Sequence, residues 1–144
     1  MERIIQEKTS ADHLLYVSLK YTKTTDVILN LINRWKSLID ISIDRLLENA
    51  KKKRVINKIP EAPKIKIDKI RDIYQKNLLI METMDLYEFF KKVENAEKVR
   101  ENEFRKNVTL KVFNRGNWIN IDIDKLKEYS GVIEKFVNQL RQIL

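Results

Sequence analysis

The chain of 144 residues contains no cysteine, a single histidine, two glycines and two prolines. Without cysteine it has no disulfide, no thiol nucleophile and no cysteine-ligated zinc. The lone His13 excludes a histidine-rich metal motif, and the isolated Gly116 and Gly131 exclude a glycine-rich phosphate loop. These absences argue against conventional thiol, metal and nucleotide chemistry, so we expect no catalytic residue, no metal ion and no cofactor.

The scarcity of glycine and proline also bears on the fold, because β-sandwiches and parallel α/β domains need frequent turns built from these residues. With 43% hydrophobic residues, the chain can bury a core in one domain without disulfide or metal support. Its longest apolar run, Leu78 to Met81, is far shorter than the roughly 20 residues of a membrane span. The N-terminal residues lack the apolar core of a signal peptide. We therefore predict one mainly α-helical domain over residues 1–144, cytoplasmic and not bound to a membrane.

The first third of the chain has the pattern of long helices. No glycine or proline occurs in residues 10–53, and we expect Ser10 to start the first helix as its N-cap. The threonines of Thr22–Thr25 allow either one helix up to Arg54 or a break into two. Apolar residues then recur at spacings of three and four, which places them on one helix face. These residues are Ile28, Ile32, Trp35, Ile39, Ile43 and Leu46.

Two prolines predict an irregular connector over residues 55–67, because proline interrupts helices. We expect Asp68 and Asp85 to start the next two helices and Asp124 to cap the last one. Gly131, inside that last helix, costs about 1 kcal/mol against alanine and would allow a close helix crossing. The fold is therefore predicted as a bundle of four to five helices.

Residues 108–123 change from the helical period to alternating apolar and polar side chains around a turn at Arg115-Gly116. A hairpin centred on this turn places each apolar residue of one strand opposite an apolar residue of the other. The predicted pairs are Val108 with Ile123, Leu110 with Ile121 and Val112 with Ile119 on one face, and Phe113 with Trp118 on the other. A lone hairpin is marginally stable in water. We therefore expect its apolar face to dock on the helices, just before the C-terminal helix.

Carboxylates cluster in three places, and such groups can hold Mg²⁺ or Ca²⁺. They are Asp40 and Asp44, Asp122 and Asp124, and Glu94, Glu97 and Glu101. Each cluster has lysine or arginine nearby in the sequence, so surface ion pairing is the interpretation that we favour.

The strongest charge feature is a basic segment in a chain whose net charge is +8. Between Lys51 and Lys66, seven positive residues stand against one acid, Glu61. The seven are Lys51, Lys52, Lys53, Arg54, Lys58, Lys64 and Lys66. Such a segment can follow the phosphate backbone of RNA or DNA. The alternative is a solvated helix end followed by a lysine-rich loop.

A second set of residues indicates contact with a protein. Trp35 and its neighbours widen the apolar helix face beyond what one adjacent helix would cover. Phe113, Arg115 and Trp118 gather at the hairpin turn, and these residue types are enriched at protein interfaces. Exposed aromatic rings next to arginine can equally stack on bases. A further alternative is that Phe113 and Trp118 pack as a cross-strand pair on a second buried face.

The motif Arg105-Lys106-Asn107 lies in what we predict to be the late part of a polar helix, with no histidine after it. In this helical layout the chain resembles the HEPN class of small helical domains, in which an arginine is followed after a short polar spacer by a histidine. Many prokaryotic members of that class are ribonucleases or toxin partners. For this chain the resemblance implies a ribonuclease or toxin-system component that lacks the usual Arg/His pair.

Three functions are therefore expected, in order of preference. The first is a non-catalytic interaction module, whose partner is another protein or a second copy of the chain in a homodimer. The alternative is nucleic-acid binding through Lys51–Lys66. The HEPN-like ribonuclease comes last, because the chain has one histidine and no cysteine.

Overall fold

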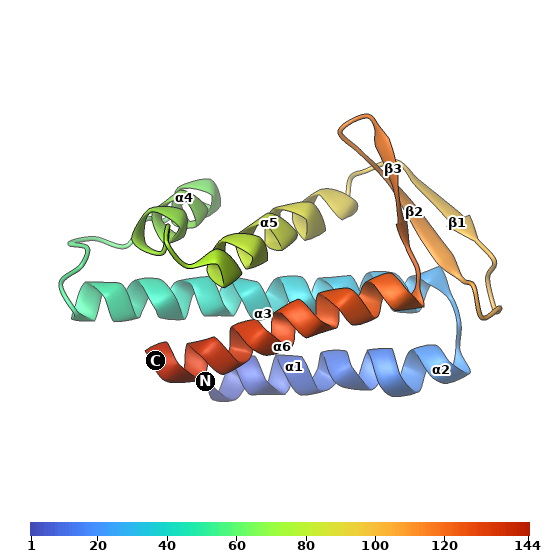
Figure 1. Ribbon diagram of the computed structural model, residues 1–144, viewed down its shortest axis with the longest axis horizontal. Helices are drawn as coiled ribbons and strands as arrows, with labels where there is room; N and C mark the ends of the chain where they lie inside the picture. The colour runs from blue at the N-terminus through green and yellow to red at the C-terminus, as the bar shows by residue number, and fades with distance from the viewer.

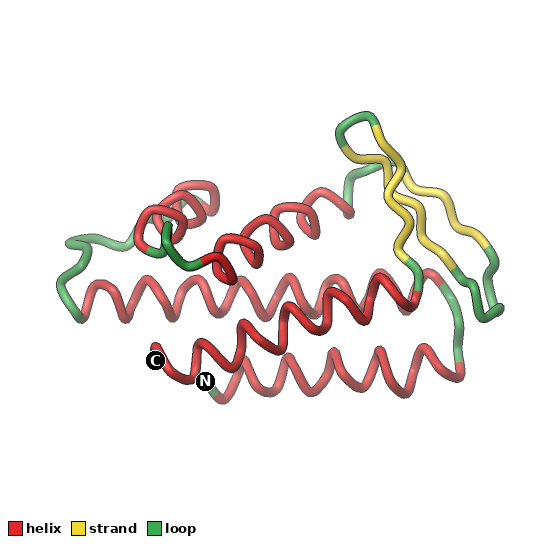
Figure 2. The backbone as a smooth tube through the Cα atoms, viewed as in Figure 1, coloured by secondary structure: helices red, strands yellow, loops and turns green.

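The computed structural model describes all 144 residues. In chain order the elements are α1 (Glu2–His13), the π-helical segment η1 (Leu14–Ser18), α2 (Leu19–Tyr21), α3 (Thr25–Lys52), α4 (Pro63–Ile73), α5 (Leu78–Val93), β1 (Lys98–Glu101), β2 (Thr109–Asn114), β3 (Asn117–Ile121) and α6 (Ile123–Ile143). The fold is mainly α, and a small sheet directly precedes the C-terminal helix, as predicted (Figure 2). None of the helices combines the length and the apolar composition that crossing a membrane requires.

The helices lie along one another, and the sheet closes one end of the molecule. The elements α1, η1 and α2 follow without a break, so they form a single long helix. Figure 1 shows this helix and α6 along one side of α3, with α4 and α5 along the other side. Since α3 contacts α1, α4, α5 and β2, it is the central helix of the fold.

Residues 10–54 form two helices and not one. The chain leaves the helix at Thr22–Thr24, and Thr24 caps α3 because its side chain accepts a hydrogen bond from the backbone N–H of Val27 (3.4 Å). The predicted start at Ser10 is wrong, since the first helix already begins at Glu2. The buried face of this helix begins with Ile4, well before Ser10, so packing on α3 continues the helix to its N-terminus.

The predicted helix starts at Asp68 and Asp85 are also wrong. The helix α4 begins at Pro63, because proline suits the first turn of a helix, where its missing N–H has no intrahelical role. The connector is therefore shorter than the predicted 55–67. The helix α5 begins after Asn77, whose side chain accepts a hydrogen bond from the backbone N–H three residues further on (3.1 Å).

Two later boundaries differ from the sequence prediction. The polar helix expected to continue to Arg105 ends at Val93, and Lys98–Glu101 pair as the strand β1. The N-cap of α6 is Asp122 and not Asp124, since the Asp122 side chain accepts a hydrogen bond from the backbone N–H three residues on (2.8 Å).

The hairpin has the register that the turn predicts. The pairs Leu110 with Ile121, Val112 with Ile119 and Phe113 with Trp118 are confirmed. The predicted pair of Val108 with Ile123 is wrong, because β3 ends at Ile121 and Ile123 is the first residue of α6. Its inner face docks on the helices, and Val108, Leu110, Val112 and Ile121 are fully buried there. The strand β1, which the sequence did not indicate, adds to β2 and completes a three-stranded antiparallel sheet in the order β1-β2-β3.

The core is one cluster of 29 buried residues drawn from the long helices and the sheet. At its centre Trp35 stacks on Phe90, with ring centroids 5.9 Å apart, and meets the edge of Tyr129 at 6.3 Å. Trp35 is 1% exposed, so its assignment to an interaction surface is wrong. The broad apolar face of α3 is covered within the chain, because helices contact it on both of its sides.

Candidate nucleic-acid interface

The outer face of the sheet, turned away from the helices, carries two exposed aromatic rings. Phe113 and Trp118 face each other across β2 and β3, with ring centroids 5.1 Å apart in an edge-to-face arrangement. They are 39% and 44% exposed, so the alternative of a second buried face is wrong, although the rings do pack as a cross-strand pair. The same face presents Val99, Lys111 and Asn120, since Lys111 pairs with Val99 on β1 and with Asn120 on β3. We call these five residues the outer face.

The turn at the end of the hairpin presents Arg115. Both turn residues have positive φ, 51° at Arg115 and 82° at Gly116, as a two-residue hairpin turn of this kind requires. Glycine or asparagine usually takes the first of these positions, whereas here it holds an exposed arginine. The Arg115 guanidinium forms no ion pair within the chain, so it is free to bind an anion.

A cleft of about 570 Å³ lies next to this turn, between the hairpin, the start of α4 and the end of α5. Four cations line it, and none of them forms an ion pair within the chain. They are Lys64, Lys91, Lys92 and Arg115, and we call this site the basic cleft. Phe113 lines the same cleft, so the outer face and the basic cleft are continuous. Of its two acids, Glu88 is neutralised by Arg71 at 2.9 Å, whereas Asp68 forms no ion pair.

Two lysine ammonium groups are held by contacts with α5 and its C-terminal end, which border the basic cleft. The Lys91 ammonium lies over the ring of Tyr87, 5.4 Å from its centroid. Burial and the hydrogen bond that the Tyr87 hydroxyl donates to Asp40 raise the pKa of Tyr87, so the ring stays neutral and attracts the cation. The Lys98 ammonium donates to three carbonyl oxygens at the end of α5, at 2.7, 2.9 and 3.0 Å. This lysine neutralises the negative end of the helix dipole, which would otherwise repel an anion in the cleft.

The structure does not gather the seven basic residues of the connector into one site. Lys51–Arg54 lie at the C-terminal end of α3, which is 28 residues long and thus about 42 Å. Figure 1 places that end of α3 opposite the sheet. Lys64 alone reaches the basic cleft, and Lys66 is paired with Asp44 at 2.8 Å.

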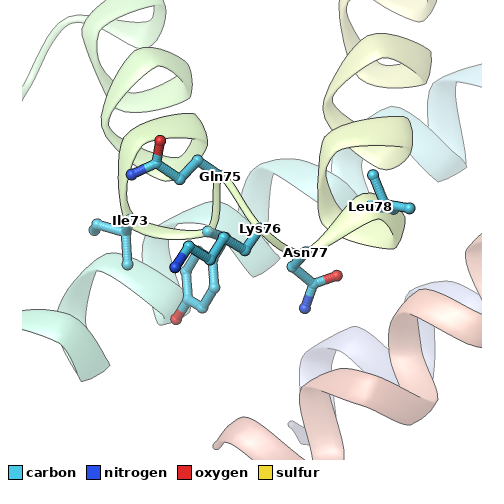
Figure 3. A pocket seen from close by; sticks show the side chains of 6 residues that line it. Ile73, Gln75, Lys76, Asn77 and Leu78 are labelled. Carbon is cyan, nitrogen blue, oxygen red and sulfur yellow. The ribbon is translucent and has the colours of Figure 1, made fainter.

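A further cleft lies at the turn between α4 and α5. Its lining residues are consecutive, from Ile73 to Leu78. Figure 3 shows Ile73 and Leu78 pointing to opposite sides, while the Asn77 side chain lies near the start of α5. The concavity is therefore a space along the turn itself, and no residues distant in the sequence converge on it. It carries no candidate site.

The groups that were considered for catalysis or metal binding do not assemble. No three histidine, aspartate or glutamate side chains lie close enough together to hold a metal ion. His13 is exposed on the first helix and forms no hydrogen bond with its side chain. Arg105 lies in the loop between β1 and β2, so the late-helix position on which the HEPN resemblance rests is wrong.

Some residues of this interface are predicted by the sequence, and others are not. Phe113, Arg115 and Trp118 were predicted from the hairpin register, and Lys64 from the charge of the connector. Lys91 and Lys92 carried no signal, because two lysines in the last turn of a helix are ordinary. Comparison of the chain with protein-family models, with curated protein sequences and with solved structures finds no match in any of the three.

Proposed function

We propose that the protein binds single-stranded nucleic acid, RNA or DNA, across the outer face and the basic cleft. One observation carries the proposal. The exposed pair Phe113 and Trp118 adjoins four cations that form no ion pair within the chain, brought together from α4, α5 and the hairpin turn. Aromatic rings on an open sheet face, beside a positively charged groove, are the two elements of single-strand binding without sequence preference.

The aromatic pair supplies the contact with bases. An unpaired base has two open faces, and stacking on a protein ring contributes about 1–3 kcal/mol per base. Phe113 and Trp118 keep each other in place through their edge-to-face contact, so little side-chain freedom remains to be lost on binding. Bases within a duplex are already stacked, and this face is therefore expected to prefer single strands.

The basic cleft supplies the contact with phosphate. Its four free cations lie in a protein of net charge +8, so the long-range field draws a polyanion towards the surface. Because these cations make no ion pair in the free protein, binding breaks no internal salt bridge. Each phosphate neutralised releases counterions, and affinity then falls as salt rises.

A second candidate function is association with another protein or a second copy of the chain through the same aromatic pair. It is favoured by the exposure of Phe113 and Trp118 beside an arginine, since these residue types are enriched in interface hot spots. The apolar face of α3 no longer supports it, because that face is buried. A homodimer formed through the hairpin predicts that light scattering detects a doubled mass, and that W118A restores the monomer.

The proposal is tested by fluorescence anisotropy with labelled single strands, at salt concentrations from about 50 to 200 mM. The key variant replaces the four cleft cations, K64Q/K91Q/K92Q/R115Q. If each contacts one phosphate, the slope of log affinity against log salt should become shallower by about 2.8, at roughly 0.7 per contact. The matched control R3Q/K127Q/K135Q/R141Q removes the same charge from exposed residues of α1 and α6 that form no ion pair, and should retain most of the slope.

The stacking contribution is tested separately with F113A and W118A. Each should weaken binding to a single strand by about 5- to 150-fold, since stacking contributes about 1–3 kcal/mol per base. Binding to a duplex of the same sequence should change little. If the wild-type chain binds no single strand at low salt, or if both quadruple variants lose affinity equally, the proposal is wrong.

A further inference from the structure

The loop between β1 and β2 presents a phenylalanine in a backbone conformation that phenylalanine rarely adopts. Phe104 has φ of 67° and is 76% exposed. Glycine adopts positive φ without steric cost, whereas a side chain with a Cβ is strained there. Because the ring packs on little of its own chain, neither backbone preference nor core packing accounts for a phenylalanine at this position.

This loop is held in place from both sides. The backbone N–H of Phe104 donates to the carbonyl oxygen of Lys23 (2.6 Å). The carboxylate of the preceding residue, Glu103, accepts hydrogen bonds from the backbone N–H and the hydroxyl of Thr25. The Asn102 side chain, at the start of the loop, donates to the carbonyl oxygen of Asn107 (3.3 Å). The exposed ring is thus presented by a fixed loop and not by a free one.

Basic and aromatic residues flank the two segments that the hydrogen bond between Phe104 and Lys23 joins. Arg105 and Lys106 follow it and form no ion pair within the chain. Tyr21, two residues before the Lys23 contact, is 78% exposed, and Lys20 lies 5.9 Å from its ring centroid. These five residues form what we call the loop end.

The acids near the loop end are already engaged, so the site keeps its positive charge. Glu101 is paired with Lys111 at 3.1 Å, and Asp26 with Arg100 at 2.6 Å. Glu103 keeps its negative charge, but its carboxylate is half-buried and bonded to Thr25 at the start of α3. An anionic partner at the loop end therefore meets the unpaired Arg105 and Lys106 against this one half-buried carboxylate.

The loop end and the hairpin turn lie at opposite ends of the same strands (Figure 1). The strand β2 runs from the loop to the hairpin turn over six residues, a distance of about 20 Å at roughly 3.3 Å per residue. Between the two ends, Lys111 on the outer face is paired with Glu101. Unpaired cations and aromatic rings therefore lie at both ends of one path: the basic cleft with the aromatic pair at one end, and the loop end at the other.

We infer that Phe104 is a further base-stacking residue, which extends the site so that a longer single strand runs from the basic cleft along the sheet to the loop end. This inference rests on the proposed function, since it names a second contact of the same ligand. A protein surface is the competing occupant, but the free cations and the spacing of rings along the strands favour a polyanion of repeating charge.

Two labelled single strands test the inference, one of about 4 nucleotides and one of about 16, which span the site sizes found for small single-strand binding domains. F104G should weaken binding of the long strand by about 5- to 150-fold, the effect of losing one stacked base. It should leave the short strand unaffected, because the aromatic pair and the basic cleft suffice to bind it. F104W keeps a stacking ring and should retain the affinity of the wild-type chain.

A stability measurement separates stacking from a structural role. F104G should unfold at the same temperature as the wild-type chain or a higher one, because glycine relieves the strain at positive φ. The matched control L78A removes an 83% exposed apolar side chain from the start of α5 and should bind both strands normally. If F104G binds the long strand as tightly as the wild-type chain does, or if F104W loses as much affinity as F104G, the inference is overturned while the proposed function stands. If the wild-type chain binds neither strand, both are overturned.

Discussion

The clearest stability prediction concerns Glu103, which joins the β1–β2 loop to the start of α3. Its carboxylate oxygens lie 3.2 and 3.3 Å from the backbone nitrogen of Thr25, and one of them also accepts a hydrogen bond from the Thr25 hydroxyl. Thr25 is fully buried, and its N–H has no other partner in the chain. The negative charge also lies at the N-terminus of a 28-residue helix, where it is favourable.

Glu103→Ala leaves two donors of Thr25 without an acceptor. Each unsatisfied buried donor costs about 1–3 kcal/mol. Glu103 itself is half-buried, so water replaces part of the lost hydrogen bonding. We therefore expect the free energy of unfolding to fall by about 2 kcal/mol in total. For a chain of this length, that loss lowers Tm by about 4–8 °C.

Thermal unfolding followed by circular dichroism at 222 nm measures this change. The matched control is Glu134→Ala, which removes an exposed carboxylate of α6 that forms no ion pair and should leave Tm almost unchanged. Glu103→Gln keeps one acceptor oxygen, so its Tm should lie between those of the Glu103→Ala and Glu134→Ala variants. Equal Tm values for the Glu103→Ala and Glu134→Ala variants would refute the assigned role of this carboxylate.

Two further predictions concern α6. Gly131 is exposed, and apart from the adjacent backbone of its own helix no atom lies within 4 Å of the place its Cβ would take, so the expected close helix crossing is absent. Gly131→Ala should therefore raise the free energy of unfolding by about 0.5–1 kcal/mol, and an unchanged urea midpoint would contradict this. Burial, helped by the charge of Glu128, raises the pKa of Tyr129 to about 12 from its usual 10.0. Since the native state holds this proton more tightly than the unfolded state, stability should fall as pH rises from about 10 to about 12. Tyr129→Phe should show a smaller loss over that range, and an equal loss in both proteins would contradict the assignment.

The hairpin was predictable because its determinants are local. Alternating side chains and a turn at Arg115-Gly116 lie within sixteen residues, and a two-residue turn permits one register. The exposed pair Phe113 and Trp118 follows directly from that register. Part of the candidate interface was therefore readable from the sequence.

The strand β1 could not be read in the same way. Its sequence is KVRE, and the residues paired with the buried Val112 and Leu110 are Lys98 and Arg100. A charged side chain at these positions hides the alternation on which strand prediction depends. The Lys98 ammonium binds the end of α5, and the Arg100 guanidinium binds the start of α3. Tertiary contacts, and not a local pattern, therefore make this segment a strand.

Helix starts were mistaken for a similar reason. Aspartate and serine are good N-caps wherever they precede a helical pattern, and several such residues compete in this chain. Asn77 caps α5 while Asp85 pairs with Arg71 at 2.8 Å in the middle of that helix. The packing of each helix on α3 decides how far it extends, and a local cap signal does not contain that information.

Residues 1–144 by themselves determined the mainly helical class, the hairpin with its register, and a positive charge that suits a polyanion. These properties depend on composition and on how often apolar side chains recur, every two residues in a strand and about every three and a half in a helix. Such patterns are formed by residues close together in the sequence. Only the tertiary structure decided that Trp35 is core, that Lys64 meets Lys91, Lys92 and Arg115, and that Lys51–Arg54 lie far from them. Those outcomes depend on which distant segments pack together, and burial of apolar surface, which drives that packing, specifies no particular partner in the sequence.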